Sequence, residues 1–283
     1  MRSSRDGRRR GRPLLGRHAA PVGAAARRTG PARGLAIDLG SSGTRAWVPG
    51  QGLVTGGPAD LEDSTRRPVR RGRIVDAEFC AGLLDRLADT ALGAHRQDSV
   101  IVLSHPVLAG PEHRALAGDL LAALGASCAV VLNSAAGAAA ACAGRLDGGP
   151  VLVVDMGAEL TEVALLVDGA VVDARQTDAG LSDLGPQSPP AELVGNVIDM
   201  ITSMWRQDRH GAVRGALRRG PVLTGGGALR RDITDRIAGC LGAPVRITPD
   251  PSTAVVRGAA LILGSVLATA GAGPVSVRPV LPR

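Results

Sequence analysis

Two segments of the sequence share a pattern that could bind a phosphate group. Residues 35–48 read LAIDLGSSGTRAWV, and residues 151–166 read VLVVDMGAELTEVALL. Each segment has an apolar stretch that ends in Asp-x-Gly, then a Thr, then a second apolar stretch. A glycine at a strand end lets backbone N–H groups approach a phosphate closely, and a nearby Asp can hold the counter-cation through water. The two segments therefore predict two strand–turn–strand hairpins, with Asp38 and Asp155 as candidate magnesium residues.

A third glycine-bearing turn follows another short apolar segment. Residues 221–223 lead into Thr224-Gly225-Gly226-Gly227, which precedes a predicted helix. One glycine-rich turn means little, because such turns are common connectors. Two matching Asp-x-Gly hairpins together with a glycine triplet before a helix are more specific.

Simpler explanations remain open for the same residues. Asp38 and Asp155, as residues at strand ends, are also typical turn formers. Thr44 and Thr161 are more often plain strand residues than phosphate contacts. The five histidines share no spacing, and neither a Ser-His-Asp order nor Gly-x-Ser-x-Gly occurs, so no hydrolase triad is indicated.

The composition excludes several classes of enzyme. All 33 basic residues are arginine, because the chain contains no lysine. A Walker P-loop, a protein kinase and a Schiff-base enzyme each need a lysine. Tyrosine is absent and only two Trp and one Phe occur, which argues against binding single-stranded nucleic acid by base stacking. We expect no specific nucleic-acid partner.

The positive charge is concentrated at the start of the chain. Residues 1–33 contain ten Arg and a single acid, Asp6, whereas the remainder is slightly acidic. We expect residues 1–33 to form a disordered Arg-rich tail, because they offer too little apolar surface to offset chain entropy. An electrostatic arm for anionic lipid or nucleic acid is the alternative.

The elements that would position these turns alternate between strands and helices, which predicts an α/β fold. Asp38 and Asp155 lie 117 residues apart, so we expect two similar domains at 34–146 and 147–283. The predicted helices are 79–91, 114–124, 134–143, 193–205, 232–241 and 252–267, and the further predicted strands are 100–103, 129–132, 221–223 and 245–247.

The cysteines and the long uncharged stretches point to the cytoplasm. The four cysteines (80, 128, 142 and 240) form no C-x-x-C pair, so we expect buried free thiols in a reducing cytosol. Residues 120–144 and 258–277 are uncharged but diluted by Gly and polar residues. We expect buried helices there and no transmembrane segment.

In their order along the chain, the three loops resemble those of the actin-like ATPase superfamily and, within it, the bacterial MreB cytoskeletal family. The first phosphate loop of that family looks like residues 37–44 (IDLGSSGT), the second like residues 155–163 (DMGAELTEV), and the adenosine loop like residues 223–229 (LTGGGAL). Residues 253–259 resemble part of the closing helix. The resemblance covers roughly residues 34–268.

The resemblance implies an α/β fold of two ribonuclease H-like domains around a cleft for ATP and Mg²⁺, and head-to-tail filaments at the membrane that guide cell-wall synthesis. It implies that Asp38 and Asp155 position the metal, with Asp155 as the catalytic residue. The implied nucleotide-binding residues are Gly40, Ser41, Ser42, Gly43, Thr44, Gly157, Thr161, Gly225, Gly226, Gly227 and Ala228.

The chain also departs from the family in three places. Little sequence stands where the family carries two lateral subdomains, so these are expected to be reduced or missing. Glu159 interrupts the second phosphate loop, where an acid within about 4 Å of a phosphate charge costs on the order of 4 kcal/mol unless its side chain points away. Asn133-Ser134 stand where the family has the acid that orients the attacking water, which predicts at most a weak ATPase.

The combined expectation is a truncated, divergent MreB-like cytoskeletal protein in the cytoplasm that binds ATP and acts in cell shape or cell-wall morphogenesis. Its expected partners are further copies of itself or other MreB-type filament proteins, and peripheral membrane contact is left open. Two alternatives remain: a nucleotide-free pseudo-actin scaffold, and an actin-fold ATPase of chaperone or kinase type. Nucleotide binding discriminates the first alternative, and ATP turnover discriminates the second.

Overall fold

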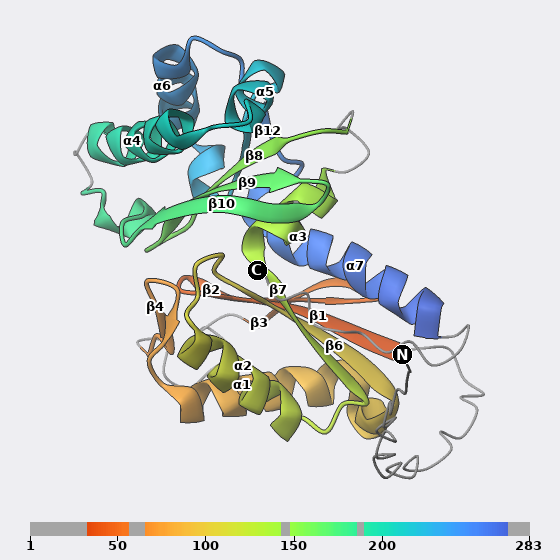
Figure 1. Cartoon of the computed structure of the whole chain (residues 1–283). Helices are drawn as coiled ribbons and strands as arrows, with labels where there is room; N and C mark the ends of the chain where they lie inside the picture. The colour runs from red at the N-terminus through yellow and green to blue at the C-terminus, as the bar shows by residue number, and fades with distance from the viewer. Residues whose placement is uncertain (1–32, 57–65, 143–147, 186–189, 271–283) are drawn as a thin grey trace, which may run out of the picture.

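The structure is a computed structural model that describes residues 33–56, 66–142, 148–185 and 190–270. Its two five-stranded sheets lie one above the other in Figure 1, with helices α3 and α7 between them. The predicted tail 1–33 lies almost wholly outside the described residues.

The first sheet contains the first Asp-x-Gly hairpin. Its strands run in the order β3-β2-β1-β6-β7, with β1, β6 and β7 parallel and β1, β2 and β3 antiparallel. β1 pairs with β2 so that Asp38 lies opposite Arg45. The strands are β1 (Arg33–Gly40), β2 (Gly43–Val48), β3 (Gly52–Gly56), β6 (Ser99–His105) and β7 (Cys128–Asn133).

The second sheet repeats this topology. Its strand order is β10-β9-β8-β11-β12, and the antiparallel β8–β9 pair places Asp155 opposite Glu162. The strands are β8 (Val151–Met156), β9 (Thr161–Val167), β10 (Ala170–Thr177), β11 (Val222–Thr224) and β12 (Arg246–Ile247). The repeated order confirms the internal duplication that the two sequence patterns predicted.

Each sheet has its own hydrophobic core on one face. α1 (Ala77–Leu92) and α2 (Pro111–Ala123) pack on the first sheet, where Leu35, Ile37 and Leu84 are fully buried. α1 begins at Asp76, whose side chain accepts a hydrogen bond from the Phe79 backbone N–H, an N-cap that satisfies a free helix donor. On the second sheet the covering helices are α4 (Ala191–Gln207), α5 (Ala212–Arg219) and α6 (Arg231–Leu241).

The two remaining helices are exchanged between the halves. α3 (Ser134–Ala141), which follows β7, packs with Ala135 and Ala138 against the second sheet. α7 (Ala254–Ala270), at the end of the described chain, packs with Val256, Ala259 and Leu263 against the first sheet. Each sheet is therefore covered in part by a helix from the other half of the chain. The domain limits 34–146 and 147–283 stay a prediction.

The described parts of the connections from β3 to α1 and from β10 to α4 are short. Between β3 and α1 the described chain forms the two-stranded hairpin β4 (Val69–Arg70) and β5 (Arg73–Ile74). Between β10 and α4 it forms a 3₁₀ turn, η4 (Leu181–Asp183). The other 3₁₀ segments are η2 (Gly93–Asp98), η5 (Gly226–Leu229) and η6 (Pro251–Thr253).

The expected helices and strands are present, with shifted ends. The helix predicted at 114–124 begins earlier, at Pro111, because proline is well suited to the first helical position. Strands β3, β4, β5 and β10 and helix α5 were not predicted as elements. The cysteine prediction was wrong in part: Cys80 and Cys142 are buried, whereas Cys128 is half-buried and Cys240 on α6 is exposed.

Helix α7 bears on the prediction of no transmembrane segment. By length and composition, Pro251–Ala268 could cross a membrane. Its inward face is packed, however, because Val256, Ala259 and Leu263 are fully buried against Ala36, Val100 and Val102. This is the pattern of a core helix that covers a sheet.

Candidate phosphate-binding cleft

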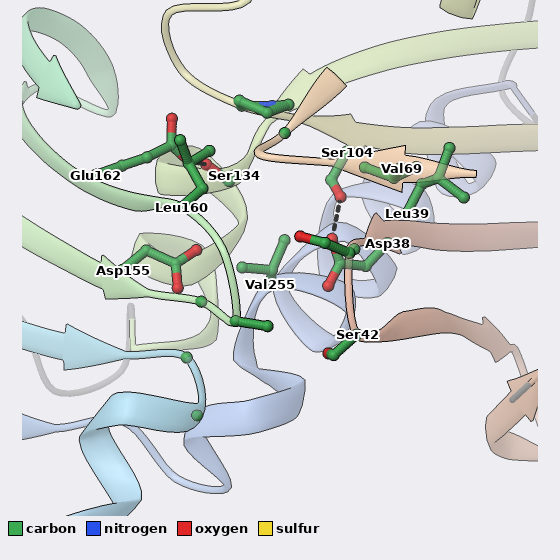
Figure 2. A pocket seen from close by; sticks show the side chains of 18 of the residues that line it. Asp38, Leu39, Ser42, Val69, Ser104, Ser134, Asp155, Leu160, Glu162 and Val255 are labelled. Carbon is green, nitrogen blue, oxygen red and sulfur yellow. Dashed lines mark hydrogen bonds between the residues drawn. The ribbon is translucent and has the colours of Figure 1, made fainter. Parts of the chain in front are cut away.

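A pocket lies where the two Asp-x-Gly turns approach each other from opposite sheets. It encloses about 220 Å³ and is lined from the first half by Asp38 and the turn after β1, and from the second by Asp155 and the turn after β8. Figure 2 shows the carboxyl groups of Asp38 and Asp155 on opposite sides of this space, with Val255 of α7 between them. Residues 117 positions apart in the chain thus share one site.

The first turn is a tight hairpin. Gly40 pairs with Gly43, and Gly43 has a φ of 155°, which favours glycine. The Ser104 hydroxyl donates a 2.6 Å hydrogen bond to Asp38 Oδ1 from the adjacent parallel strand. Burial raises the pKa of Asp38, and the Ser104 hydrogen bond and the charge of Arg45 oppose that rise.

Arg45 is a functional candidate that the sequence reasoning missed. It lines the pocket and lies opposite Asp38 on β2. Directly opposed residues of an antiparallel pair lie on the same face of the sheet. The signal was present in the sequence, since Arg45 and Glu162 occupy the same place in the two repeats, directly after the shared Thr.

The second hairpin carries an acid, Glu162 on β9, at the place where the first carries Arg45 on β2. Glu162 is only 5% exposed, and its Oε1 accepts a 2.6 Å hydrogen bond from the Val107 N–H. Its Oε2 accepts a 2.9 Å hydrogen bond from the Ser134 hydroxyl at the start of α3. Burial raises the pKa of Glu162 to about 7 despite these bonds. Glu162 therefore links the second sheet to the first half of the chain.

The carboxyl group of Asp155 has a strongly raised pKa. Burial first, then the charges of Glu162 and Asp38, raise its pKa to about 8. A carboxylate that shares a low-dielectric site with other carboxylates holds its proton. A bound cation would offset this repulsion.

The glycine triplet packs closely against the end of β8. A Cβ on Gly225, whose φ is 77°, would lie 2.5 Å from Asp155 Oδ1 and 2.4 Å from the Met156 carbonyl oxygen. A Cβ on Gly227 would lie 2.5 Å from the Met156 Cβ. Any larger side chain at Gly225 would therefore displace Asp155.

No protein-family model matches the sequence, and no curated protein matches it. Solved structures do match the fold. MreB5 of Spiroplasma citri bound to ADP superposes with a TM-score of 0.71 at 16% identity, over 86% of this chain and 99% of that one. The MamK double helical filament superposes with a TM-score of 0.62 at 16% identity, over 82% of this chain and 98% of that one. The ethanolamine utilization protein EutJ from Carboxydothermus hydrogenoformans superposes with a TM-score of 0.54 at 17% identity, over 82% of this chain and 90% of that one.

The chain has the actin-like ATPase fold. The expectation of an α/β fold of this kind is thereby confirmed, and in the described residues only a two-stranded hairpin and a 3₁₀ turn stand where lateral subdomains were expected to be reduced or missing.

The actin-like fold gathers most, but not all, of the predicted site residues in the pocket. Among them, those that line it are Asp38, Gly40, Ser41, Ser42, Asp155, Gly157, Gly225 and Gly226. Gly43, Thr44, Thr161, Gly227 and Ala228 are outside this lining. Thr44 and Thr161 are buried, and the Thr161 hydroxyl donates to the Ala179 carbonyl at 2.8 Å. The contact observed for Thr161 is that of a structural strand residue, which was the simpler of the two explanations.

Glu159, the acid inside the second phosphate loop, points away from the pocket of this actin-like protein. Its Oε2 accepts a 3.0 Å hydrogen bond from the Arg71 backbone N–H, and its Oε1 lies 3.5 Å from Arg67 Nη1. It is not among the residues that line the pocket. Glu159 therefore meets the requirement that an acid in this loop must direct its carboxylate away from a bound phosphate.

The acidic residues fit a hydrated Mg²⁺ better than a bare one. Carboxylate oxygens are suitable Mg²⁺ ligands, and the ion usually keeps several waters and binds substrate phosphates as well. Within the described residues, no group of three His, Cys, Asp or Glu side chains converges on one point that could hold a metal. Asp38 and Asp155 could instead hold the ion from two sides, each through water.

Proposed function

We propose that this chain is an MreB-type cytoskeletal protein that binds ATP with Mg²⁺ in the cleft between its two sheets. The observation that carries the proposal is the approach of the two Asp-x-Gly turns to a single pocket, with Asp38 and Asp155 facing one another across it. Two solved neighbours support it, since crystals of MreB5 of Spiroplasma citri contain bound ADP in one case and bound AMPPNP in the other.

Each part of the cleft has a separate role in this proposal. The turns at 40–43 and 158–160 would offer backbone N–H groups to the phosphates, whereas the Gly157 N–H already donates to the Leu160 carbonyl at 2.9 Å. Arg45 would supply positive charge beside the phosphates. The Mg²⁺ supplies charge neutralisation when it is bound, and Asp38 and Asp155 orient its water ligands. The glycines at 225 and 226 allow the nucleoside to lie close to the backbone.

Hydrolysis is proposed to be weak. The N-terminal end of α3 carries Ser134, whose hydroxyl donates to Glu162, and a serine is a poor general base. Glu162 is an acid in the same region, but both of its oxygens already accept hydrogen bonds from Val107 and Ser134. Asp155 is left as the proposed catalytic residue.

Self-association is also part of the proposal, as are a cytoplasmic location and a role in cell shape. The MamK neighbour was solved as a double helical filament, which supports assembly by this fold. Peripheral membrane contact is tested by sedimentation with anionic vesicles. Filament formation is tested by high-speed pelleting and negative-stain microscopy with Mg-ATP, Mg-ADP or EDTA.

Isothermal titration calorimetry of the full chain with Mg-ATP tests the central claim. We expect a single site, lost or strongly weakened when Asp155→Asn removes the carboxylate at the cleft. Asp119→Asn is the matched control, because Asp119 is exposed on α2 and remote from the pocket lining. A dissociation constant of about 1 mM corresponds to a binding free energy of about −4 kcal/mol. If the wild-type chain binds no nucleotide at about 1 mM, the result contradicts nucleotide binding and favours the pseudo-actin scaffold.

A further inference from the structure

The β4–β5 hairpin reaches from the first half of the chain to the second phosphate loop. Its base is fixed in the first core by Val69, which is 2% exposed. Its turn consists of Arg71 and Gly72, with φ values of 47° and 72°. A Cβ on Gly72 would lie 2.7 Å from Leu160 Cδ2 and 2.8 Å from Pro106 Cγ, so the turn packs directly against the loop that contains Glu159.

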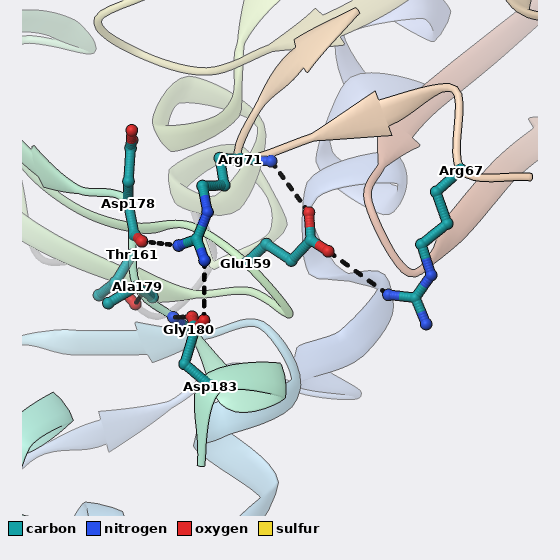
Figure 3. A network of polar contacts seen from close by, with 8 residues as sticks. All are labelled: Arg67, Arg71, Glu159, Thr161, Asp178, Ala179, Gly180 and Asp183. Atoms are coloured by element: carbon teal, nitrogen blue, oxygen red, sulfur yellow. Dashed lines mark hydrogen bonds and ion pairs between the residues drawn. The ribbon is translucent and has the colours of Figure 1, made fainter. Parts of the chain in front are cut away.

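Two arginines of this segment hold Glu159. The Arg71 backbone N–H donates to Glu159 Oε2 at 3.0 Å, and the Arg67 guanidinium pairs with Oε1 at 3.5 Å. The Glu159 side chain is only 12% exposed. Figure 3 shows its carboxyl group directed toward both arginines, as dashed lines mark.

The Arg71 side chain is attached to the segment behind the same loop. Its guanidinium pairs with Asp183 Oδ1 at 2.9 Å and donates to the Asp178 carbonyl. Asp183 Oδ2 accepts from the Gly180 N–H at 2.9 Å, so this carboxylate joins the hairpin to η4. The hydrogen bonds of Asp183 with Arg71 and then Gly180 lower its pKa.

η4 in turn fixes the backbone of the phosphate loop. The Leu181 and Ser182 N–H groups donate to the carbonyls of Gly157 and Ala158 at 3.1 and 2.7 Å. A Cβ on Gly180 would lie 2.5 Å from the Ala158 carbonyl oxygen. The hairpin, the phosphate loop and η4 therefore form one continuous set of contacts across the two halves.

These ion pairs are too exposed to be understood as a source of stability. Arg67 and Arg71 have side chains 46% and 43% exposed, and such pairs contribute about 0–1 kcal/mol. Their effect is on the position of a charge. An acid within about 4 Å of a phosphate costs between roughly 1 and 4 kcal/mol as the effective dielectric falls from 80 to 20.

We propose that the β4–β5 hairpin is an interdomain clasp in which Arg67 and Arg71 hold the Glu159 carboxylate out of the phosphate pocket. The two arginines are then positioning residues for the nucleotide, and they compensate for the acid that interrupts the loop. The benefit to nucleotide binding rests on the proposed function, whereas the closure of the clasp does not.

The first experiment measures Mg-ATP affinity in a set of variants. Arg67→Ala with Arg71→Ala removes the ion pair with Glu159 Oε1 and the guanidinium contacts with Asp183 and Asp178 that fix the turn, and with it the Arg71 N–H, beside Oε2. This double variant is expected to raise the dissociation constant at least about fivefold, the factor for one unit charge near 4 Å in a water-like dielectric. Adding Glu159→Gln is expected to restore the wild-type value, because the displaced side chain is then neutral. Arg70→Ala is the matched control, since Arg70 is exposed on strand β4 of the same hairpin.

Rescue by Glu159→Gln separates this role from a structural or a direct one. If the triple variant stays as weak as the double variant, the arginines act on the nucleotide or the fold themselves, and the proposal is overturned. An unchanged affinity in the double variant also overturns it.

The second experiment uses the protein without nucleotide. Hydrogen exchange of the full chain is expected to show faster exchange at residues 157–161 and 180–184 in the double variant, and unchanged exchange in Arg70→Ala. Unchanged exchange in the double variant overturns the clasp. If the wild-type chain binds no Mg-ATP, the proposed function fails, and this second result still decides whether the clasp exists.

Discussion

Gly258 of α7 lies directly against the backbone of Gly137 of α3. A Cβ on Gly258 would lie 1.6 Å from the Gly137 carbonyl oxygen, and a Cβ on Gly137 would lie 2.8 Å from the Val255 carbonyl oxygen. The two exchanged helices therefore cross backbone to backbone, at the place where the chain passes between the two sheets (Figure 1). Neither glycine has a positive φ, so close approach is the reason for glycine here.

Gly258→Ala is expected to destabilise the protein by about 1–3 kcal/mol, the usual cost of overpacking. Alanine favours helix by up to about 1 kcal/mol over glycine, so a loss of stability reports the clash alone. Gly264→Ala on the same helix is the matched control, because its Cβ would meet no atom within 4 Å. Urea unfolding followed by circular dichroism measures both. Equal behaviour of the two variants would contradict the close crossing.

The nucleotide-free protein is expected to lose stability as pH rises from about 4 to about 8. Asp155 and Glu162 have pKa values raised to about 8 and about 7, against ordinary values of 3.8 and 4.5. Between these limits the folded state binds protons that the unfolded state has released, so the free energy of unfolding falls with pH. Asp38, also raised, adds to the trend, while Arg45 opposes it for Asp38 and Asp155.

Urea unfolding in EDTA at pH 5, 6, 7 and 8 measures this dependence. Asp155→Asn is expected to flatten the dependence of the free energy of unfolding on pH, because a neutral amide replaces the carboxyl group whose pKa is raised to about 8. Mg²⁺ with nucleotide is expected to restore stability chiefly at pH 8, where the carboxylates are ionised. A free energy of unfolding that rises between pH 5 and 8 would count against the raised pKa values.

Arg45→Met is expected to weaken Mg-ATP binding by about 10- to 150-fold, the factor that corresponds to the loss of one charge-assisted contact of about 1.5–3 kcal/mol. Methionine keeps much of the length of the side chain and removes its charge and its N–H donors. Arg86→Met, at an exposed position on α1, is the control. Calorimetry with Mg-ATP and Mg-ADP measures both variants, and an Arg45→Met affinity equal to that of the control would remove Arg45 from the site.

The thiols are expected to react with Ellman's reagent in a definite order. Cys240 is exposed on α6 and should react first, whereas Cys80 and Cys142 are buried and should react only after unfolding. Burial, and then the charge of Asp76, raise the pKa of Cys80 to about 11, which further suppresses its thiolate. Cys240→Ser should abolish the fast phase. Cys128 is half-buried and should react at an intermediate rate. A fast phase of unchanged amplitude in Cys240→Ser would contradict the exposure of Cys240.

Local sequence was sufficient to predict the two hairpins and most of the helices. Each Asp-x-Gly turn joins strands that follow one another directly, so alternation and a glycine specify it within about 15 residues. Thr161 shows the limit of such patterns. The family resemblance implied that Thr161 binds phosphate, yet its hydroxyl donates to the Ala179 carbonyl, which follows β10, the strand paired with β9.

The sequence by itself determined the duplicated α/β topology and placed Asp38 and Asp155 at equivalent strand ends. Tertiary structure decided the direction of Glu159, because its partners Arg71 and Arg67 are 88 and 92 residues away in the chain. It also decided that α3 and α7 exchange sheets. The physical reason is the same for both: strand alternation and turn chemistry act between neighbours, whereas charge pairing and helix packing depend on which distant segments the two sheets bring together.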